Sequence, residues 1–157
     1  MSLNVNIRGI EEAIRNLTGV FSDQRVRELC RRLAEYGLVL ADASFSGAAY
    51  DGRRDVTVSI EENGNGYRIV AAGVSVLFIE FGAGVTLGYG HPLAGAMGYG
   101  PGTYPGHGNW DNPNGWYIPR SKGGGHTYGN PPSMSMYNTA RDLQSEIANI
   151  AREVFAT

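Results

Sequence analysis

The clearest structural signal in the chain is the carboxy-terminal stretch NPPSMSMYNTARDLQSEIANIAREVF, residues 130–155. Its apolar positions recur at intervals of three and four residues, the period of one face of a helix. Asn130 is a favourable N-cap, and a proline is well tolerated at the first helical position. We therefore predict a helix from about Pro131 to Phe155 that buries its apolar stripe. The stripe comprises Met136, Ala140, Leu143, Ile147, Ile150 and Val154.

A second helix is predicted from residue 23 to about residue 45. Ser22 can cap it, and Phe21 and Val26 occupy the positions of a hydrophobic staple. Gly37 is an internal weak point that costs up to about 1 kcal/mol in a helix. The predicted apolar stripe comprises Val26, Leu29, Leu33, Tyr36, Leu40 and Ala43.

Alternating apolar residues indicate short strands elsewhere. Residues 3–8 alternate, and residues 10–17 then fit a short amphipathic helix. Residues 56–61 and 67–71 alternate on either side of Asn63–Gly66, a strong hairpin turn. The run 74–82 is too short to assign from its period. We predict one α+β domain over residues 1–157, with a small antiparallel sheet packed against the long helix and the carboxy-terminal helix.

Residues 82–130 form an unusual segment that we interpret as a long loop within this domain. They hold 15 of the 23 glycines and 5 of the 7 prolines, and their only charged residues are Asp111, Arg120 and Lys122. A flexible linker would be poor in aromatic residues, yet this segment carries seven. Because aromatic side chains dominate interface hot spots, we predict that the loop is an assembly element rather than part of the core. Its aromatic residues are Tyr89, Tyr99, Tyr104, Trp110, Trp116, Tyr117 and Tyr128.

Composition narrows the classes of function. The net charge of −2 disfavours a general binder of the phosphate backbone of nucleic acids. Cys30 is the single cysteine, so it forms no intrachain disulfide, and its place beside Leu29 and Leu33 predicts a small core residue. No apolar run is long enough to cross a bilayer, and the amino terminus lacks a signal-peptide core. We expect a soluble protein made in a reducing cytoplasm.

Candidate metal and nucleotide sites are weak. The three histidines, His91, His107 and His126, lie in the loop near Asp111, but their separations match no zinc-ligand motif. The runs 98–102 and 104–108 resemble phosphate loops, yet proline interrupts both and no helix follows. We therefore expect no metal, no cofactor and no nucleotide site.

Glu80 is the one carboxylate inside an apolar run, where burial could make it a general acid or base. Because no partner stands at a suggestive local spacing, we expect it to pair with an arginine or to cap backbone amides at a turn near Gly82. The arginines of the long helix and of positions 53 and 54 alternate with acidic residues. Mixed signs favour a solvated face or a salt-bridged contact between subunits over a phosphate track.

Several of these segments together resemble a known family. In chain order, the segments that carry the resemblance begin with the strand ending Ile7-Arg8-Gly9, the two helices and the hairpin. They continue with Ile79-Glu80-Phe81-Gly82, the glycine- and tryptophan-containing loop, and Asn130-Pro131-Pro132 with Met136-Tyr137 before the last helix. The chain resembles the minor tail, neck or tail-completion proteins of long-tailed bacteriophages. Two features depart from that pattern. Residues 45–50 replace an Ala-Pro-x-x-Thr-Gly-x-Leu segment of many relatives, and the 82–130 loop is longer.

The resemblance implies a structural, non-enzymatic virion protein made in the bacterial host. It would oligomerise as a ring where head meets tail, with the connector or stopper on one side and the tail terminator or tail tube on the other. It implies no membrane contact and no sequence-specific nucleic-acid recognition, although DNA could pass through the lumen of the ring. Glu80, Phe81 and Gly82 would form a structural motif in such a protein.

Two other classes remain open from the residues. One is a carbohydrate- or receptor-binding tail module in which the tyrosines and tryptophans of the loop stack on sugars. The other is a metal-dependent hydrolase that uses His91, His107, His126 and Asp111.

Overall fold

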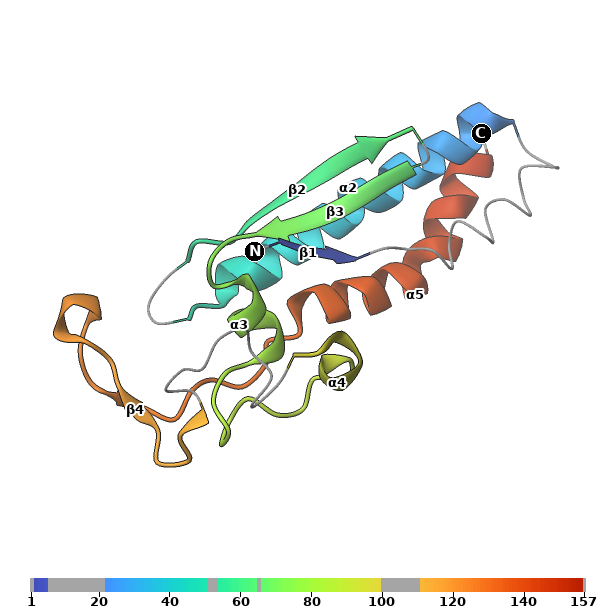
Figure 1. Ribbon diagram of the computed structural model, residues 1–157. Helices are drawn as coiled ribbons and strands as arrows, with labels where there is room; N and C mark the ends of the chain where they lie inside the picture. Colours follow the sequence, from blue (N-terminus) through green and yellow to red (C-terminus); the bar gives the residue numbers. More distant parts are fainter. Residues whose placement is uncertain (1, 6–21, 51–53, 65, 100–110, 157) are drawn as a thin grey trace. The chain divides into compact units, whose positions relative to one another are not determined.

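The computed structural model describes residues 2–5, 22–50, 54–64, 66–99 and 111–156. It confirms an α+β fold, with a long helix, a small antiparallel sheet and a carboxy-terminal helix (Figure 1). The helix predicted over residues 10–17 lies outside the described residues. The elements are β1 (Ser2–Val5), α2 (Asp23–Gly47), β2 (Thr57–Asn63), β3 (Gly66–Ala72), α3 (Val76–Phe81), α4 (Ala94–Met97), β4 (Trp116–Tyr117), the 3-10 turn η2 (Arg120–Lys122), β5 (His126–Thr127) and α5 (Ser135–Phe155).

Contacts divide the chain into two compact units, each made of segments that alternate along the sequence. The helix–sheet unit comprises Ser2–Ala43, Thr57–Ala72 and Met136–Thr157. The loop unit comprises Ser44–Val56 and Gly73–Ser135. That the chain forms a single domain remains a prediction.

The sheet of the helix–sheet unit has the strand order β1-β3-β2, and all its pairs are antiparallel (Figure 1). Ile60 of β2 faces Ile69 of β3, and Leu3 of β1 faces Ala71 on the other side of β3. This confirms the predicted hairpin, in which alternating β-branched residues flank a turn that contains glycine. Ile69, Val70 and Ala71 are buried, so the central strand contributes to the core of this unit.

α2 confirms the predicted long helix but corrects its buried face. Val26, Leu29 and Leu33 are buried as expected, whereas Tyr36 is 39% exposed and Ala43 is exposed. In a helix of 3.6 residues per turn, neighbouring residues point in different directions. After Leu33 the predicted stripe used Tyr36 and Leu40, each one residue before a buried position, and it therefore turned away from the core. After Leu33 the buried positions are Ala34, Gly37, Ala41 and Phe45. Gly37 is therefore part of the packed face and α2 continues through it.

α5 confirms the predicted carboxy-terminal helix, although it begins at Ser135, four residues after the expected start. Met136, Leu143 and Val154 are buried, and Ala140, Ile147 and Ile150 are half-buried. Asn130 is not its N-cap, because Asn130 forms a β-bridge with Ala83. Cys30 of α2 is half-buried rather than fully within the core.

The loop unit contains α3, formed by the run whose period could not be assigned. Five of its six residues are buried, so the helix has no polar face to give a periodic signal. The side chain of Asp55 fixes the backbone just before α3, because the amides of Val74 and Ser75 donate to Asp55 Oδ2 at 2.7 and 3.3 Å. Tyr50 stacks on Phe78 of this helix at a ring-centroid distance of 4.6 Å.

Candidate functional site

Residues 79–83 and 130–134 meet at the base of the loop. Ala83 and Asn130 exchange two backbone hydrogen bonds, of 2.9 Å from the Ala83 amide and 3.0 Å from the Asn130 amide. The amide of Ser133 then donates to the carbonyl of Ile79 at 2.7 Å. The amide of Met134 donates to the carbonyl of Glu80 at 3.2 Å. These bonds satisfy carbonyls near the end of α3, which would otherwise lack intrahelical partners.

Glycine is required at this closure for steric reasons. Gly82 has a φ of 79°, and a Cβ there would lie 2.8 Å from the carbonyl oxygen of Asn130. Gly129 has a φ of 101°, and a Cβ there would collide with the carbonyl group of Ala83. L-residues rarely adopt such φ values. The glycine of Ile79-Glu80-Phe81-Gly82 is therefore needed for the backbone of one segment to approach the other.

Glu80 forms a buried pair with His91, a partner that was not anticipated from the sequence. His91 Nε2 lies 3.1 Å from Glu80 Oε1, and each side chain is only 2% exposed. The amide of Leu93 donates to His91 Nδ1 at 3.1 Å, so Nδ1 carries no proton. The proton of a neutral imidazole then resides on Nε2, which donates to the Glu80 carboxylate.

Aromatic rings of the loop unit surround this pair. The ring of Phe81 lies 4.3 Å from that of His91 and 4.7 Å from that of Tyr99, which stacks on it. Buried charged groups persist where hydrogen bonds and a partner compensate for lost hydration. A carboxylate and an imidazole with so little exposed surface cannot meet a substrate in this arrangement. We therefore interpret the pair as a structural anchor that ties His91 to α3.

The pairing of Glu80 with His91 was missed in the sequence, although a signal for it exists. A carboxylate within an apolar run needs a buried partner. His91 is the first histidine, lysine or arginine after Glu80 along the chain. The glycines between them allow the chain to turn back, so the partner did not need helical or strand spacing.

The aromatic residues predicted to form an interface are placed in two groups. Tyr89, Tyr117 and Tyr128 are exposed, with Tyr117 reaching 79%. Tyr99 is half-buried against Phe81, and Trp116 is half-buried in β4. Tyr104 and Trp110 lie outside the described residues. Because Tyr99 stacks on Phe81, its ring is less exposed than that of Tyr117.

The β4–β5 hairpin carries a continuous exposed aromatic face. Tyr117 and His126 are paired across the two strands, and their rings meet edge-on at 4.8 Å. Tyr128 follows on the same side, with its ring 4.9 Å from that of His126. We call these three residues the hairpin aromatic face.

The candidate metal ligands are not gathered by the described part of the chain. His91 is buried against Glu80, His126 belongs to the exposed hairpin, and His107 lies outside the described residues. Within the residues described, no group of three or more His, Cys, Asp or Glu side chains is arranged to hold a metal ion.

Asp55 is a second polar anchor that the sequence did not reveal. Partial burial would raise its pKa, but the hydrogen bonds from Ser75 and from the amides of Val74 and Ser75 outweigh this effect and lower the pKa below its usual value. Gly73 lies close by, and a Cβ there would stand 2.6 Å from the carbonyl oxygen of Asp55.

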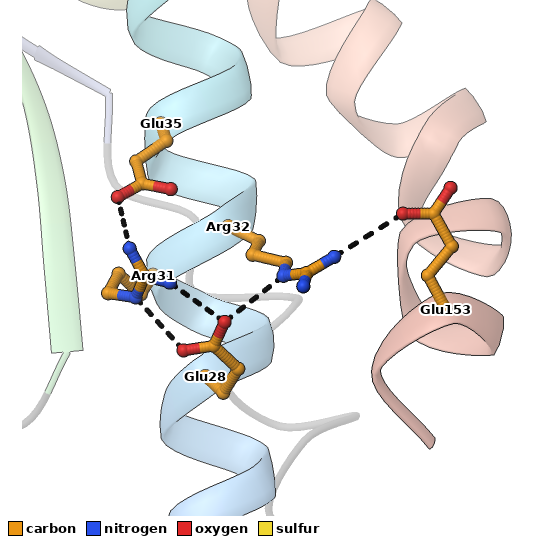
Figure 2. A network of polar contacts seen from close by, with 5 residues as sticks. All are labelled: Glu28, Arg31, Arg32, Glu35 and Glu153. Carbon is orange, nitrogen blue, oxygen red and sulfur yellow. Dashed lines mark hydrogen bonds and ion pairs between the residues drawn. The ribbon is translucent and has the colours of Figure 1, made fainter. Parts of the chain in front are cut away.

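In the helix–sheet unit, Arg31 and Arg32 of α2 form an ion-pair network with nearby acids (Figure 2). Hydrogen bonds from Arg31 and Arg32 lower the pKa of Glu28 to about 2. Arg31 also pairs with Glu35, and Arg32 reaches Glu153 of α5 at 3.4 Å. Burial and nearby Glu62 raise the pKa of Tyr67, so its hydroxyl stays protonated. The mixed-sign segment therefore forms a salt-bridged exposed face in this region.

Comparison with models of protein families, with curated proteins and with solved structures gave no match. Among the described residues, no helix combines the length and apolar character that a membrane span requires.

Proposed function

We propose that this protein is a structural component of a bacteriophage virion, a neck or tail-completion protein that acts without catalysis. It assembles into a homo-oligomeric ring at the head–tail junction and joins the connector or stopper to the tail terminator or tail tube. DNA could pass through the lumen of this ring, and the virion is its site of action.

One observation carries the proposal. Ile79–Gly82 and Asn130–Pro132 are the most specific parts of the phage-like pattern, and they are bonded to each other through the Ala83–Asn130 bridge and the adjacent amides. Two motifs separated by a long loop thus form one structural feature. Such a contact gives their shared order and spacing a physical reason, since each segment needs the other.

The exposed part of the loop supports an assembly role. Tyrosine side chains bury a large area at low entropic cost and are enriched at interface hot spots. The hairpin aromatic face presents two of them on a short, glycine-rich hairpin. A closed ring needs contacts between two different faces of the same subunit, and this face is a candidate for one side of that contact.

The test is the oligomeric state of the purified full chain, measured by light scattering and negative-stain microscopy over a range of concentrations. We expect the wild type to form closed rings and the double variant Tyr117→Ala/Tyr128→Ala to remain monomeric with an unchanged melting temperature. Tyr36→Ala removes an exposed aromatic of α2 and is the matched control. A wild-type monomer that also fails to join neck and tail proteins of the same phage would refute the proposal.

The same aromatic face is the specific reason to keep a sugar-binding tail module as a second candidate. Exposed tyrosines can stack on sugar rings, and Tyr117 is almost fully exposed. A glycan array with the wild type and Tyr117→Ala separates the two functions. Binding that is lost in the variant while the protein stays monomeric favours the module.

A further inference from the structure

A surface cavity of about 520 Å³ lies beside the first half of α2 in the helix–sheet unit. Its volume falls in the range of pockets that hold small ligands. Four guanidinium groups contribute to its lining, against a single carboxylate. The residues that matter for its chemistry are Arg25, Arg27, Glu28, Arg31, Arg32 and Tyr67.

Two of these guanidinium groups are held in place by acidic side chains (Figure 2). Arg31 donates to both oxygens of Glu28 and to Glu35. Arg32 donates to Glu28 Oε1 at 3.0 Å and to Glu153 Oε2 at 3.4 Å. A guanidinium has five N–H donors, so these bonds engage three donors of Arg31 and two of Arg32. The carboxylates thus orient both groups without exhausting their donors.

The other two arginines supply positive charge with less compensation. Arg25 Nη1 donates to the carbonyl of Phe155 at 3.2 Å, a neutral acceptor. Arg27 makes no ion pair within the described part of the chain. The hydroxyl of Tyr67 also lines the wall, and its proton is engaged by the carboxylate of Glu62. The cavity is therefore rich in hydrogen-bond donors, and its one carboxylate is already engaged by Arg31 and Arg32.

We propose that this cavity binds a small, multiply charged phosphate compound of the pyrophosphate or tripolyphosphate type. Guanidinium groups match phosphate oxygens in charge and geometry. A phosphate is tetrahedral and accepts hydrogen bonds from several directions, whereas one bidentate arginine occupies both oxygens of a planar carboxylate. Arginines on several parts of one cavity wall therefore favour a phosphate. This site is local and compatible with the absence of an extended phosphate track, and it does not depend on the proposed assembly function.

The test is calorimetric titration of the full chain with sodium pyrophosphate and with tripolyphosphate, at fixed pH and ionic strength. We expect saturable binding that Arg27→Gln weakens by about tenfold, the effect of losing one charge-assisted hydrogen bond. Arg120→Gln makes the same charge change in the loop unit and should leave binding unaltered. Both arginines are exposed, so both variants should fold, which thermal unfolding will verify.

Three results would overturn the assignment. The first is the absence of saturable binding by the wild type. The second is equal weakening by Arg27→Gln and Arg120→Gln, because it would indicate general attraction to a cationic surface. The third is binding of a hexaglutamate peptide without binding of pyrophosphate, which would make the site a receptor for protein carboxylates instead.

Discussion

A methyl group added to Gly37 would stand 2.8 Å from Cδ1 of Leu143 and would also collide with Cδ1 of Ile69. These residues belong to α2, α5 and β3, so both helices and the central strand meet where α2 has no side chain. Gly37, Ile69 and Leu143 are all buried. The glycine therefore sets how closely the three elements of this core approach one another.

Gly37→Ala should destabilise the protein, although alanine is the better helix former by about 1 kcal/mol. Inserting a carbon atom into a close-packed core costs about 1–3 kcal/mol, which exceeds the gain in helix propensity. The free energy of unfolding, measured with urea by circular dichroism, should fall.

Gly47→Ala is the matched control, because it lies at the end of the same helix and nothing occupies the space within 4 Å of its added Cβ. Its stability should be unchanged or higher. Combining Gly37→Ala with Leu143→Ala should cost less than the sum of the single changes, since the truncated leucine makes room. A Gly37→Ala variant more stable than the wild type would contradict this account of the packing.

Local periodicity was sufficient to predict α2 and α5, because each has one buried and one exposed face. The β2–β3 hairpin was predicted from alternation and its turn, although β3 buries Ile69, Val70 and Ala71 in succession. Periodicity could not assign α3, whose short run is buried nearly all round. The start of α5 was placed too early because the amides of Ser133 and Met134 are bonded to carbonyls of Ile79 and Glu80. These acceptors lie about fifty residues earlier in the chain, so the sequence around Ser133 does not reveal the hydrogen bonds.

The site was predictable only in part. Its motif residues Glu80, Phe81 and Gly82 were identified, yet the partner His91 was not, since a glycine-rich turn has no fixed spacing. The loop aromatics looked alike in sequence. Only tertiary contacts distinguish Tyr99, which stacks on Phe81, from the exposed Tyr117.

His91→Ala should be among the most damaging single changes in the loop unit. It removes the hydrogen bond from the imidazole to the buried Glu80 carboxylate, and the loss of such a partner costs about 1–3 kcal/mol, more for a charged group. Glu80→Gln should cost less, because the amide oxygen can still accept the proton of His91 Nε2. Urea unfolding of both variants provides the comparison. His126→Ala changes an exposed histidine, and its free energy of unfolding should stay within about 0.5 kcal/mol of the wild type. If His91→Ala loses no more stability than His126→Ala, the Glu80–His91 pair is not an anchor.

Because of Asp55, the free energy of unfolding should decrease in acid. Its pKa is lower in the folded protein than its usual value of 3.8. The folded state therefore favours the carboxylate, and this contribution is complete above the unfolded pKa and lost as the pH falls through the folded pKa. Asp55→Asn should lower stability at pH 7 and flatten the decline below about pH 4. Urea titrations at several pH values test this, with the exposed Asp42→Asn as control. An unchanged acid slope in Asp55→Asn would place the pH dependence elsewhere.

Removing the tip of the hairpin should leave the fold intact, whereas removing the whole 82–130 loop should not. We expect that the entire loop is not separable from the core, because His91 pairs with buried Glu80 and Tyr99 covers Phe81. The Ile118 amide donates to the carbonyl of Gly125 just beyond the Tyr117–His126 pair, so Asn-Gly can replace residues 119–124 as a two-residue turn.

The short-turn variant retains the hairpin aromatic face and should unfold cooperatively at the temperature of the wild type. Replacing residues 83–129 with a Gly-Ser linker removes His91 and also Ala83, the bridge partner of Asn130. The free energy of unfolding of that variant should fall by several kcal/mol, and it should melt at a lower temperature. Thermal unfolding of the two variants side by side decides the matter. If the complete replacement melts like the wild type, the loop is dispensable for folding and the Glu80–His91 pair is not the anchor inferred from its burial.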